Sequence, residues 1–242
     1  MSAEGKRRHS EAQSCIPVRR NVAAAVKRPT IKRSEAHYLT LAEVGRLLEA
    51  AKSDRLESLI VTMLGTDLRR GEALALHWSD VDLSATHVRV RWTLSRINRQ
   101  FVFDEPKTDR SRRFVPLPQP VVETLKHHRV SQTAERLAAP VWAPWEEHPD
   151  LVFTTHIGTP LDPRNALRAF EKIGEHAGLT GVGLHTLRHT AASALIASGA
   201  HLKVVQEMLG HSSYGITADI YSHVAMDQQR EAAERLGEAF QW

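Results

Sequence analysis

Hydrophobic and polar positions follow two different periods along this chain. Beyond a polar N-terminal stretch, apolar residues recur every three or four positions, as on one face of a helix. Thr40 and Glu43 form a capping box ahead of such a stripe, which predicts a first helix ending at about Ala51. The same period predicts two more helices, one over about 56–64 and one starting near Arg69.

A period of two follows this helical part. Val88 and Trp92 lie in a segment where apolar and basic residues alternate, which predicts a strand. Apolar residues at 101–103 and at 114–115 predict two more short strands, on either side of a turn-rich segment at 108–111. We expect one small antiparallel sheet with a basic hairpin tip.

The helical period then returns and continues to the C-terminus. It predicts helices over about 121–137 and 163–176, and a helix carrying Leu187 that Gly199 closes from the C′ position. A final helix is expected over about 226–240. The predicted fold class is mainly α with a small antiparallel β-sheet, an α+β domain.

Charge divides the chain differently from hydrophobicity. Residues 1–37 hold nine Lys and Arg against three acids and few large apolar residues, which predicts a basic, flexible arm. Residues 38–242, expected to form one domain, are nearly neutral, but the stretch 89–113 has eight basic residues against three acids. Such a footprint fits a phosphate-backbone partner, and it equally fits a solvated tail with no partner.

Composition excludes several classes of protein. Of the 242 residues, 42% are hydrophobic, which is enough for a core. The longest apolar run, 59–64, is too short to span a bilayer, and no apolar segment follows the basic N-terminus as in a secretory signal. Cys15 is the only cysteine, which excludes an internal disulfide and a cysteine-built zinc site and suits the cytoplasm.

Four short segments carry residues suited to phosphate chemistry. They are Asp67-Leu68-Arg69-Arg70-Gly71-Glu72, Pro106-Lys107-Thr108-Asp109-Arg110-Ser111-Arg112-Arg113, His185-Thr186-Leu187-Arg188, and Leu209-Gly210-His211 with Tyr221 ten residues beyond. Together, and in this order, they resemble the tyrosine recombinases, the integrase family of phages and mobile elements. The resemblance spans residues 38–224 and implies the catalytic-domain fold of that family.

The resemblance implies a site-specific recombinase or integrase that cuts and rejoins DNA through a 3′-phosphotyrosine. Cutting a phosphodiester without a metal requires cations on the non-bridging oxygens, a nucleophile, and an acid for the leaving 5′ oxygen. Arginine suits the first task because its planar fork stays charged and can bind two phosphate oxygens. Arg69 and Arg188 match the paired arginines of the family.

The other catalytic roles follow from the same resemblance. Lys107 matches the general acid, His185 assists proton transfer, His211 hydrogen-bonds the phosphate, and Tyr221 is the nucleophile. The chemistry needs neither a metal nor another cofactor. Expected DNA contacts come from Arg70, Arg110, Arg112 and Arg113, and in the arm from Lys27, Arg28, Lys32 and Arg33. The expected partners are double-stranded DNA, three further copies of the chain in a tetramer and an accessory DNA-bending protein. The expected location is the cytoplasm, in association with the nucleoid, for a protein of bacterial or phage origin.

Each of these residues also has a structural interpretation. Arg69 could form a helix-face ion pair with Glu72, and Lys107 could be a solvated turn lysine. His185 and His189 have the spacing of a metal pair, but no third ligand is evident. The ordered set, rather than any single member, favours the recombinase interpretation.

The chain departs from the family in two places. Asp67 stands where glycine is common, so its carboxylate either pairs with an active-site cation or points outward. Only 37 residues precede the domain, where relatives carry a helical core-binding domain, so the chain is a truncated remnant, a fragment or a naturally short variant. Two other functions stay open: a type IB topoisomerase-like activity, and a non-catalytic DNA-binding remnant of an integrase.

Overall fold

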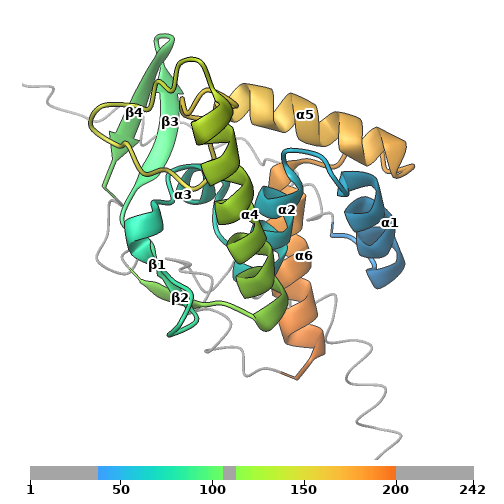
Figure 1. Cartoon of the computed structure of the whole chain (residues 1–242). Helices are drawn as coiled ribbons and strands as arrows, with labels where there is room; N and C mark the ends of the chain where they lie inside the picture. The colour runs from blue at the N-terminus through green and yellow to red at the C-terminus, as the bar shows by residue number, and fades with distance from the viewer. Residues whose placement is uncertain (1–37, 106–112, 200–242) are drawn as a thin grey trace, which may run out of the picture. The chain divides into compact units, whose positions relative to one another are not determined.

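The computed structural model describes residues 38–105 and 113–199. Six α-helices, a short 3-10 helix (Trp78–Asp80) and five short strands lie in this part of the chain (Figure 1). The helices are α1 (Leu41–Ala51), α2 (Glu57–Thr66), α3 (Arg70–Leu74), α4 (Gln119–Ala138), α5 (Pro163–His176) and α6 (Leu184–Ala197). The strands are β1 (Val81–Asp82), β2 (His87–Arg89), β3 (Thr93–Ile97), β4 (Gln100–Asp104) and β5 (Phe114–Pro116).

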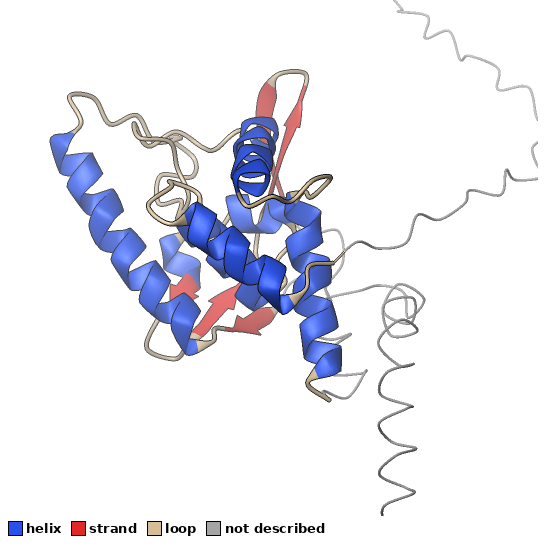
Figure 2. Cartoon of the chain, turned by 90° about the vertical axis from the view of Figure 1, so that its right-hand side faces the viewer, coloured by secondary structure: helices blue, strands red, loops and turns tan. Residues whose placement is uncertain are grey.

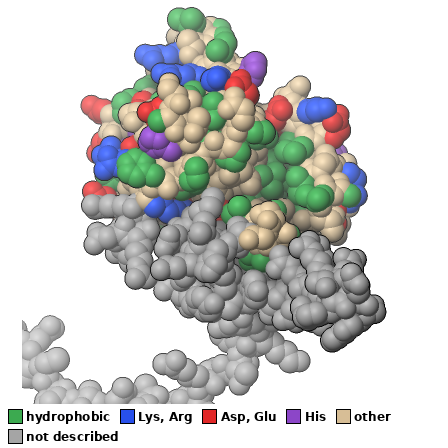
Figure 3. Space-filling view, turned by 90° about the horizontal axis from the view of Figure 1, so that it is seen from below, with side chains coloured by type: hydrophobic (Ala, Val, Ile, Leu, Met, Phe, Trp, Pro, Cys, Tyr) green, Lys and Arg blue, Asp and Glu red, His purple; other side chains and the backbone are tan. Residues whose placement is uncertain are grey.

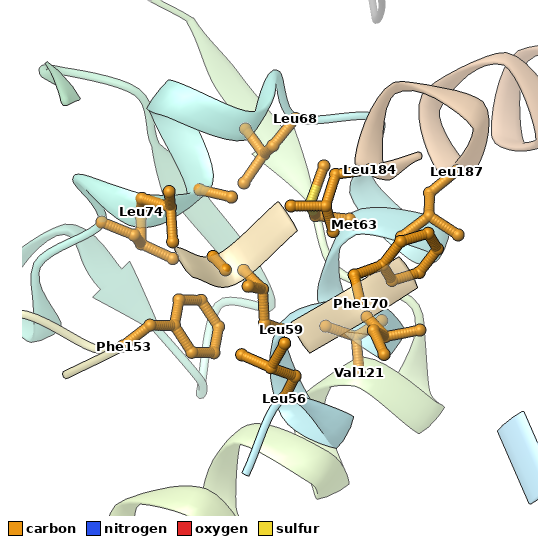
Figure 4. Packing of buried hydrophobic residues seen from close by; sticks show 14 of the residues in the cluster. Leu56, Leu59, Met63, Leu68, Leu74, Val121, Phe153, Phe170, Leu184 and Leu187 are labelled. Carbon is orange, nitrogen blue, oxygen red and sulfur yellow. The ribbon is translucent and has the colours of Figure 1, made fainter. Parts of the chain in front are cut away.

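Helix α2 occupies the centre of the helical layer. It is apolar on most of its surface and packs against α1, α3, α4 and α6, which enclose it (Figures 1 and 2). Its buried side chains meet those of its neighbours in one hydrophobic core (Figure 4). The largest fully buried members include Leu59, Met63, Leu74, Leu125, Phe153, Phe170, Leu184 and Leu187. Burial of this apolar surface is the main force that fixes α3 and α6, the helices that carry the candidate site.

Helix ends follow the sequence signals closely. Thr40 accepts a hydrogen bond from the Glu43 N–H, while Glu43 accepts one from the Thr40 N–H, so the predicted capping box of α1 is confirmed. Asp162 caps α5 by accepting from the N–H groups of Arg164 and Asn165. Gly199 follows the C-cap of α6 with φ of 82°, a conformation that glycine adopts without the penalty of a side chain.

The prediction of one antiparallel sheet was wrong, because the strands form two. One sheet has the order β1-β2-β5, and β3 pairs with β4 in a separate hairpin. The alternating segment that began at Val88 leaves the first sheet after Arg89, where the chain crosses to the hairpin. The hairpin turns at Asn98 and Arg99, both with positive φ, as a two-residue turn requires. The expected basic tip at 108–111 lies outside the described residues.

Aromatic contacts hold the hairpin against the long loop between α4 and α5. Phe103 stacks on His148 with ring centroids 3.9 Å apart, and Phe101 meets Trp145 edge to face at 5.6 Å. The hairpin stands out from the body beside α5 (Figures 1 and 2). On its inner side α3 packs directly against β3.

Gly71 permits that close packing of α3 on β3. A Cβ atom at this position would lie 2.5 Å from Thr93 Oγ1 and 2.9 Å from the Leu94 carbonyl oxygen. We therefore expect Gly71→Ala to lower the free energy of unfolding by about 1–3 kcal/mol, because the strand backbone must move. Gly45→Ala in α1 is the control. Apart from the chain neighbours and the backbone of its own helix, no heavy atom of the described residues lies within 4 Å of the added Cβ, so the variant should gain roughly 0.5–1 kcal/mol from helix propensity. Urea unfolding of both variants checks the prediction, and equal effects would contradict it.

Candidate active site

Arg69 stands at the junction between α2 and α3. The chain leaves α2 through Asp67, which adopts a left-handed conformation with φ of 54°, and Leu68 is buried before α3 begins. Arg69 then forms the N-cap of α3, where its N–H donates to Glu72 Oε2 at 2.9 Å. Its Nη1 donates to Glu72 Oε1 at 2.8 Å. The helix-face ion pair considered from the sequence is therefore present, and the Arg69 side chain stays about one-third exposed.

A second arginine, Arg113, binds the carboxylate of Glu72 from the segment that leads into β5. Arg113 donates from Nη2 to Glu72 Oε2 at 3.0 Å and from Nη1 to Oε1 at 3.2 Å. Burial would raise the pKa of Glu72, but the hydrogen bonds and charges of Arg113 and Arg69 hold it below its ordinary value. Arg113 was predicted to contact DNA. In the structure its side chain is buried and directed inward to Glu72.

Helix α6 brings the next two residues to the same region. Glycine precedes its first turn, and its packing against α2 places His185 and Arg188 near Arg69. The Arg188 side chain is buried, and its Nη1 donates to the main-chain carbonyl of Asp67 at 2.9 Å. Residues more than a hundred positions apart are thus joined by one charged hydrogen bond at the end of α2.

The carboxylate of Asp67 points inward, toward the guanidinium of Arg188. Its Oδ2 lies 3.5 Å from Nη2 of Arg188, and the side chain is 2% exposed. Among the residues that the structure describes, neither carboxylate oxygen has a hydrogen-bond partner. Burial raises the pKa of Asp67 to about 7, against the opposing effect of the nearby arginines. Of the two orientations left open by the sequence, the paired one is confirmed.

His185 lies at the mouth of the site, in the first turn of α6. Together with Arg69 and Arg70 it lines a cavity of about 890 Å³. Desolvation of its ring, followed by the charges of Arg188, Arg70 and Arg69, lowers the pKa of His185, which favours the neutral imidazole. A neutral imidazole can accept a proton. The ring of His189 meets it edge to face at 5.8 Å, and within the described ranges no three His, Cys, Asp or Glu side chains are grouped as a metal site.

Arginines dominate the lining of that cavity. Basic and acidic side chains are interspersed on the face seen in Figure 3, whereas the cavity has six arginines and one acid, Asp162. Its arginines are Arg69, Arg70, Arg96, Arg99, Arg164 and Arg168. Four of these were missed from the sequence. Two sequence signals could have indicated them. Arg96 and Arg99 lie within the basic stretch 89–113, and Arg164 and Arg168 are spaced one helical turn apart, so they share a face of α5.

An ion pair between Arg96 and Asp162 joins the two walls of the cavity. Arg96 projects from β3, and Asp162 is the N-cap of α5. The pair links the hairpin to the helix on the opposite wall and leaves Arg99, Arg164 and Arg168 exposed. These three arginines therefore present their charge to whatever occupies the cavity.

The remaining predicted residues lie outside the described ranges. They are Lys107, Arg110, Arg112, His211, Tyr221 and the arm residues Lys27, Arg28, Lys32 and Arg33. The structure thus brings together Arg69, Arg70, His185 and Arg188 of the predicted set. No helix in the part that the structure describes is long and apolar enough to cross a membrane.

Comparison with known proteins finds one family over most of the chain. The model of the phage integrase family matches residues 37–228. A tyrosine recombinase XerC-like protein of Caldanaerobacter subterraneus subsp. tengcongensis is 38% identical, over 82% of this chain and 53% of its own length. An integrase of Streptomyces ambofaciens is 34% identical, over 76% of this chain and 48% of its own. The chain therefore spans about half the length of these relatives.

Solved structures agree with the described fold. The Tn1549 transposon integrase, in complex with transposon right-end DNA, matches 90% of this chain and 71% of its own with a TM-score of 0.73 at 22% identity. The XerA recombinase matches 84% of this chain and 66% of its own with a TM-score of 0.65 at 26% identity. The predicted fold class, mainly α with a small antiparallel β component, is confirmed, although the β component forms two sheets instead of the one expected.

The hydrogen bonds that Arg113 and Arg69 both donate to the Glu72 carboxylate lead to a prediction about stability. We expect Arg113→Met to lower the free energy of unfolding by about 1–3 kcal/mol at pH 7, because a buried carboxylate loses two charged hydrogen bonds. The depressed pKa of Glu72 gives stability that is present above its unfolded pKa and is lost as the pH falls. The loss caused by the variant should therefore shrink from pH 7 to pH 4.

Urea unfolding at several pH values measures this effect. Arg136→Met on the exposed surface of α4 removes the same charge away from Glu72 and serves as the control. A loss of stability in Arg113→Met that does not vary with pH would show that Arg113 does not lower the pKa of Glu72.

Proposed function

The chain belongs to the phage integrase family, and we propose that it breaks and rejoins double-stranded DNA through a covalent 3′-phosphotyrosine. The observation that carries the proposal is the convergence of Arg69, Arg188 and His185 beside an arginine-lined cavity. Two fixed cations and a neutral imidazole are what a metal-free phosphoryl transfer requires of its surroundings. The names of the relatives, recombinases and integrases, support the same reaction.

In the proposed reaction the Tyr221 oxygen attacks the phosphorus of one strand. The bond from that oxygen to phosphorus forms as the bond to the 5′ oxygen breaks. His185 receives the tyrosine proton and Lys107 supplies the proton that the 5′ oxygen takes up. Arg69, Arg188 and His211 balance the charge on the non-bridging oxygens. A 5′ hydroxyl of another strand reverses the step, so exchange needs no external energy source.

The walls of the cavity provide a surface for the DNA backbone. Arg99, Arg164 and Arg168 are exposed there, on two elements that the Arg96–Asp162 pair joins. Positively charged side chains that neutralise phosphates provide affinity independent of sequence. We extend the DNA-binding set from the sequence to these residues, and retain Lys27, Arg28, Lys32, Arg33, Arg110 and Arg112 as proposed contacts.

The wider organisation belongs to the same proposal. Residues 38–242 form the catalytic domain and residues 1–37 a basic arm along the DNA. In this proposal four copies assemble at two duplexes, with an accessory DNA-bending protein, and the segment from Met226 onward docks either on a neighbouring copy or on its own domain. This assembly occurs at the bacterial nucleoid.

A covalent adduct tests the proposed reaction. We expect wild-type protein, incubated with supercoiled DNA from the region flanking its gene and quenched with SDS, to become attached to a 3′ end. Tyr221→Phe should give no adduct because it lacks the nucleophilic oxygen. An adduct that survives this change would assign the nucleophile elsewhere, with Tyr214 examined first, and no adduct with either protein would favour a non-catalytic DNA-binding protein. Relaxation of the DNA without recombinant products would identify topoisomerase-like activity.

The cavity arginines lead to a separate prediction on binding. Arg168→Gln should weaken DNA binding on all sequences and reduce the slope of log affinity against log salt by about 0.9, the change expected for one lost phosphate contact. Arg136→Gln on α4 removes the same charge away from the cavity and should leave the slope nearly unchanged. Fluorescence anisotropy over a salt series measures both variants. Equal slopes in the two variants would exclude the α5 wall from the DNA interface.

A further inference from the structure

Asp67 occupies an unusual position for an ionisable side chain. It ends α2 in a left-handed conformation with 2% of its surface exposed, and its two carboxylate oxygens make no hydrogen bond to any part of the chain that the structure describes. Buried carboxylates normally accept several hydrogen bonds. Within the described ranges, the nearest cationic atom is Nη2 of Arg188, 3.5 Å away, which is longer than a strong charged hydrogen bond. The carboxylate is therefore poorly compensated.

The main chain and the side chain of Asp67 act differently on Arg188. The main-chain carbonyl of Asp67 accepts a hydrogen bond from Arg188 Nη1 at 2.9 Å, and this contact does not depend on the side chain at position 67. The carboxylate adds a negative charge beside the guanidinium. A phosphate that binds Arg188 would bring its own negative charge to the same place, where two anions repel each other strongly at low dielectric.

We propose that Asp67 is a positioning residue whose carboxyl group takes up a proton from solvent when a phosphate binds Arg188, so that phosphate replaces Asp67 as the counter-charge. The proton neutralises the carboxylate, and the Asp67 carbonyl keeps Arg188 in place. This inference rests on the proposed function for its phosphate ligand. It adds a coupling between phosphate binding and proton uptake within this site.

The charged groups around Asp67 allow its carboxylate to take up a proton near neutral pH. Arg188 of α6, Arg113 ahead of β5 and Arg69 at the start of α3 favour the ionised form, while Glu72 of α3 opposes it. Desolvation outweighs these effects and raises the pKa of Asp67 to about 7. A phosphate nearby acts in the same direction as Glu72. Proton uptake is therefore accessible at physiological pH.

The test compares wild-type protein with Asp67→Asn, which keeps the shape and removes the charge. The rate of adduct formation is measured from pH 6 to pH 8 at DNA concentrations below saturation, where the free protein's ionisation governs the rate. With a pKa of about 7, Asp67→Asn should be about tenfold faster than wild type at pH 8 and less than twofold faster at pH 6.

Other groups in the site also titrate in this range, and two comparisons separate them. His185, His189 and the site residues outside the described ranges are shared by both proteins, so the ratio of the two rates cancels their effect. Asp54→Asn removes one negative charge at the opposite end of α2 and should match wild type at each pH. A constant ratio between Asp67→Asn and wild type would overturn the proposal.

A second measurement does not depend on DNA cleavage. A folded-state pKa above the unfolded value means that the folded protein holds the proton more tightly, so wild-type stability falls as the pH rises from about 4 to about 7. Asp67→Asn lacks this loss, so its melting temperature should exceed that of wild type increasingly from pH 5 to pH 8. Sulfate, whose charge is constant over this range, should stabilise wild type more at pH 6 than at pH 8 and Asp67→Asn about equally at both.

The two measurements distinguish the possible failures. Absence of any adduct together with the expected sulfate and melting behaviour would reject the proposed reaction and retain the role of Asp67. Adducts with no pH-dependent difference in either measurement would reject the role of Asp67 alone. If Asp67→Asn fails to fold, Asp67→Gly suits the left-handed backbone and gives the same comparison.

Discussion

The buried carboxylate of Glu72 is the interaction on which the rest of the site depends. It binds the N–H and the guanidinium of Arg69 within α3, and it also binds Arg113 from the approach to β5. A charge removed from water is tolerated only when it is paired and hydrogen-bonded, and here two arginines and a backbone donor meet that need. One side chain thereby fixes the start of α3, the guanidinium of Arg69, whose catalytic role is proposed, and Arg113 at the approach to β5.

Helix packing supplies the other half of the site. Arg188 reaches Asp67 only because α6 packs along α2, and this packing follows from apolar faces that bury Leu184 and Leu187. The same core sets α3 against β3, through a glycine that admits close contact. The hydrophobic core thus determines where the charged side chains of α3 and α6 lie relative to one another. Their charges then determine which ligands the site can bind.

The sequence predicted the helices well because their signals are local. Capping at Thr40, the proline and cap at the start of α5, and the glycine after α6 act within a few residues of each helix end. The division of the strands into two sheets was missed, since register depends on distant partners such as Val115 opposite Val88. The hairpin turn was missed too, because Asn98-Arg99 lacks the glycine that usually marks such a turn.

The candidate site shows the same limit. Motif order was enough to select Arg69, His185 and Arg188, but residue type did not separate an arginine that faces DNA from one that is buried. Arg113 was expected to contact DNA at the surface, whereas its side chain is buried and binds Glu72. Arg168 was not predicted, because α5 carries no recognisable motif. Which arginine is structural depends on where the carboxylates lie, and Glu72 and Asp67 are placed only by the fold.

The two buried carboxylates have opposite electrostatic situations although they share neighbours. Hydrogen bonds hold the pKa of Glu72 low, whereas the carboxylate of Asp67 accepts none from the described residues and its pKa is raised. A fully bonded carboxylate acts as a fixed part of the structure over the physiological range of pH. An unbonded one remains free to change its charge when its surroundings change. The site therefore pairs a permanent counter-ion for Arg69 with an exchangeable one for Arg188, and only the second can yield its place to a phosphate.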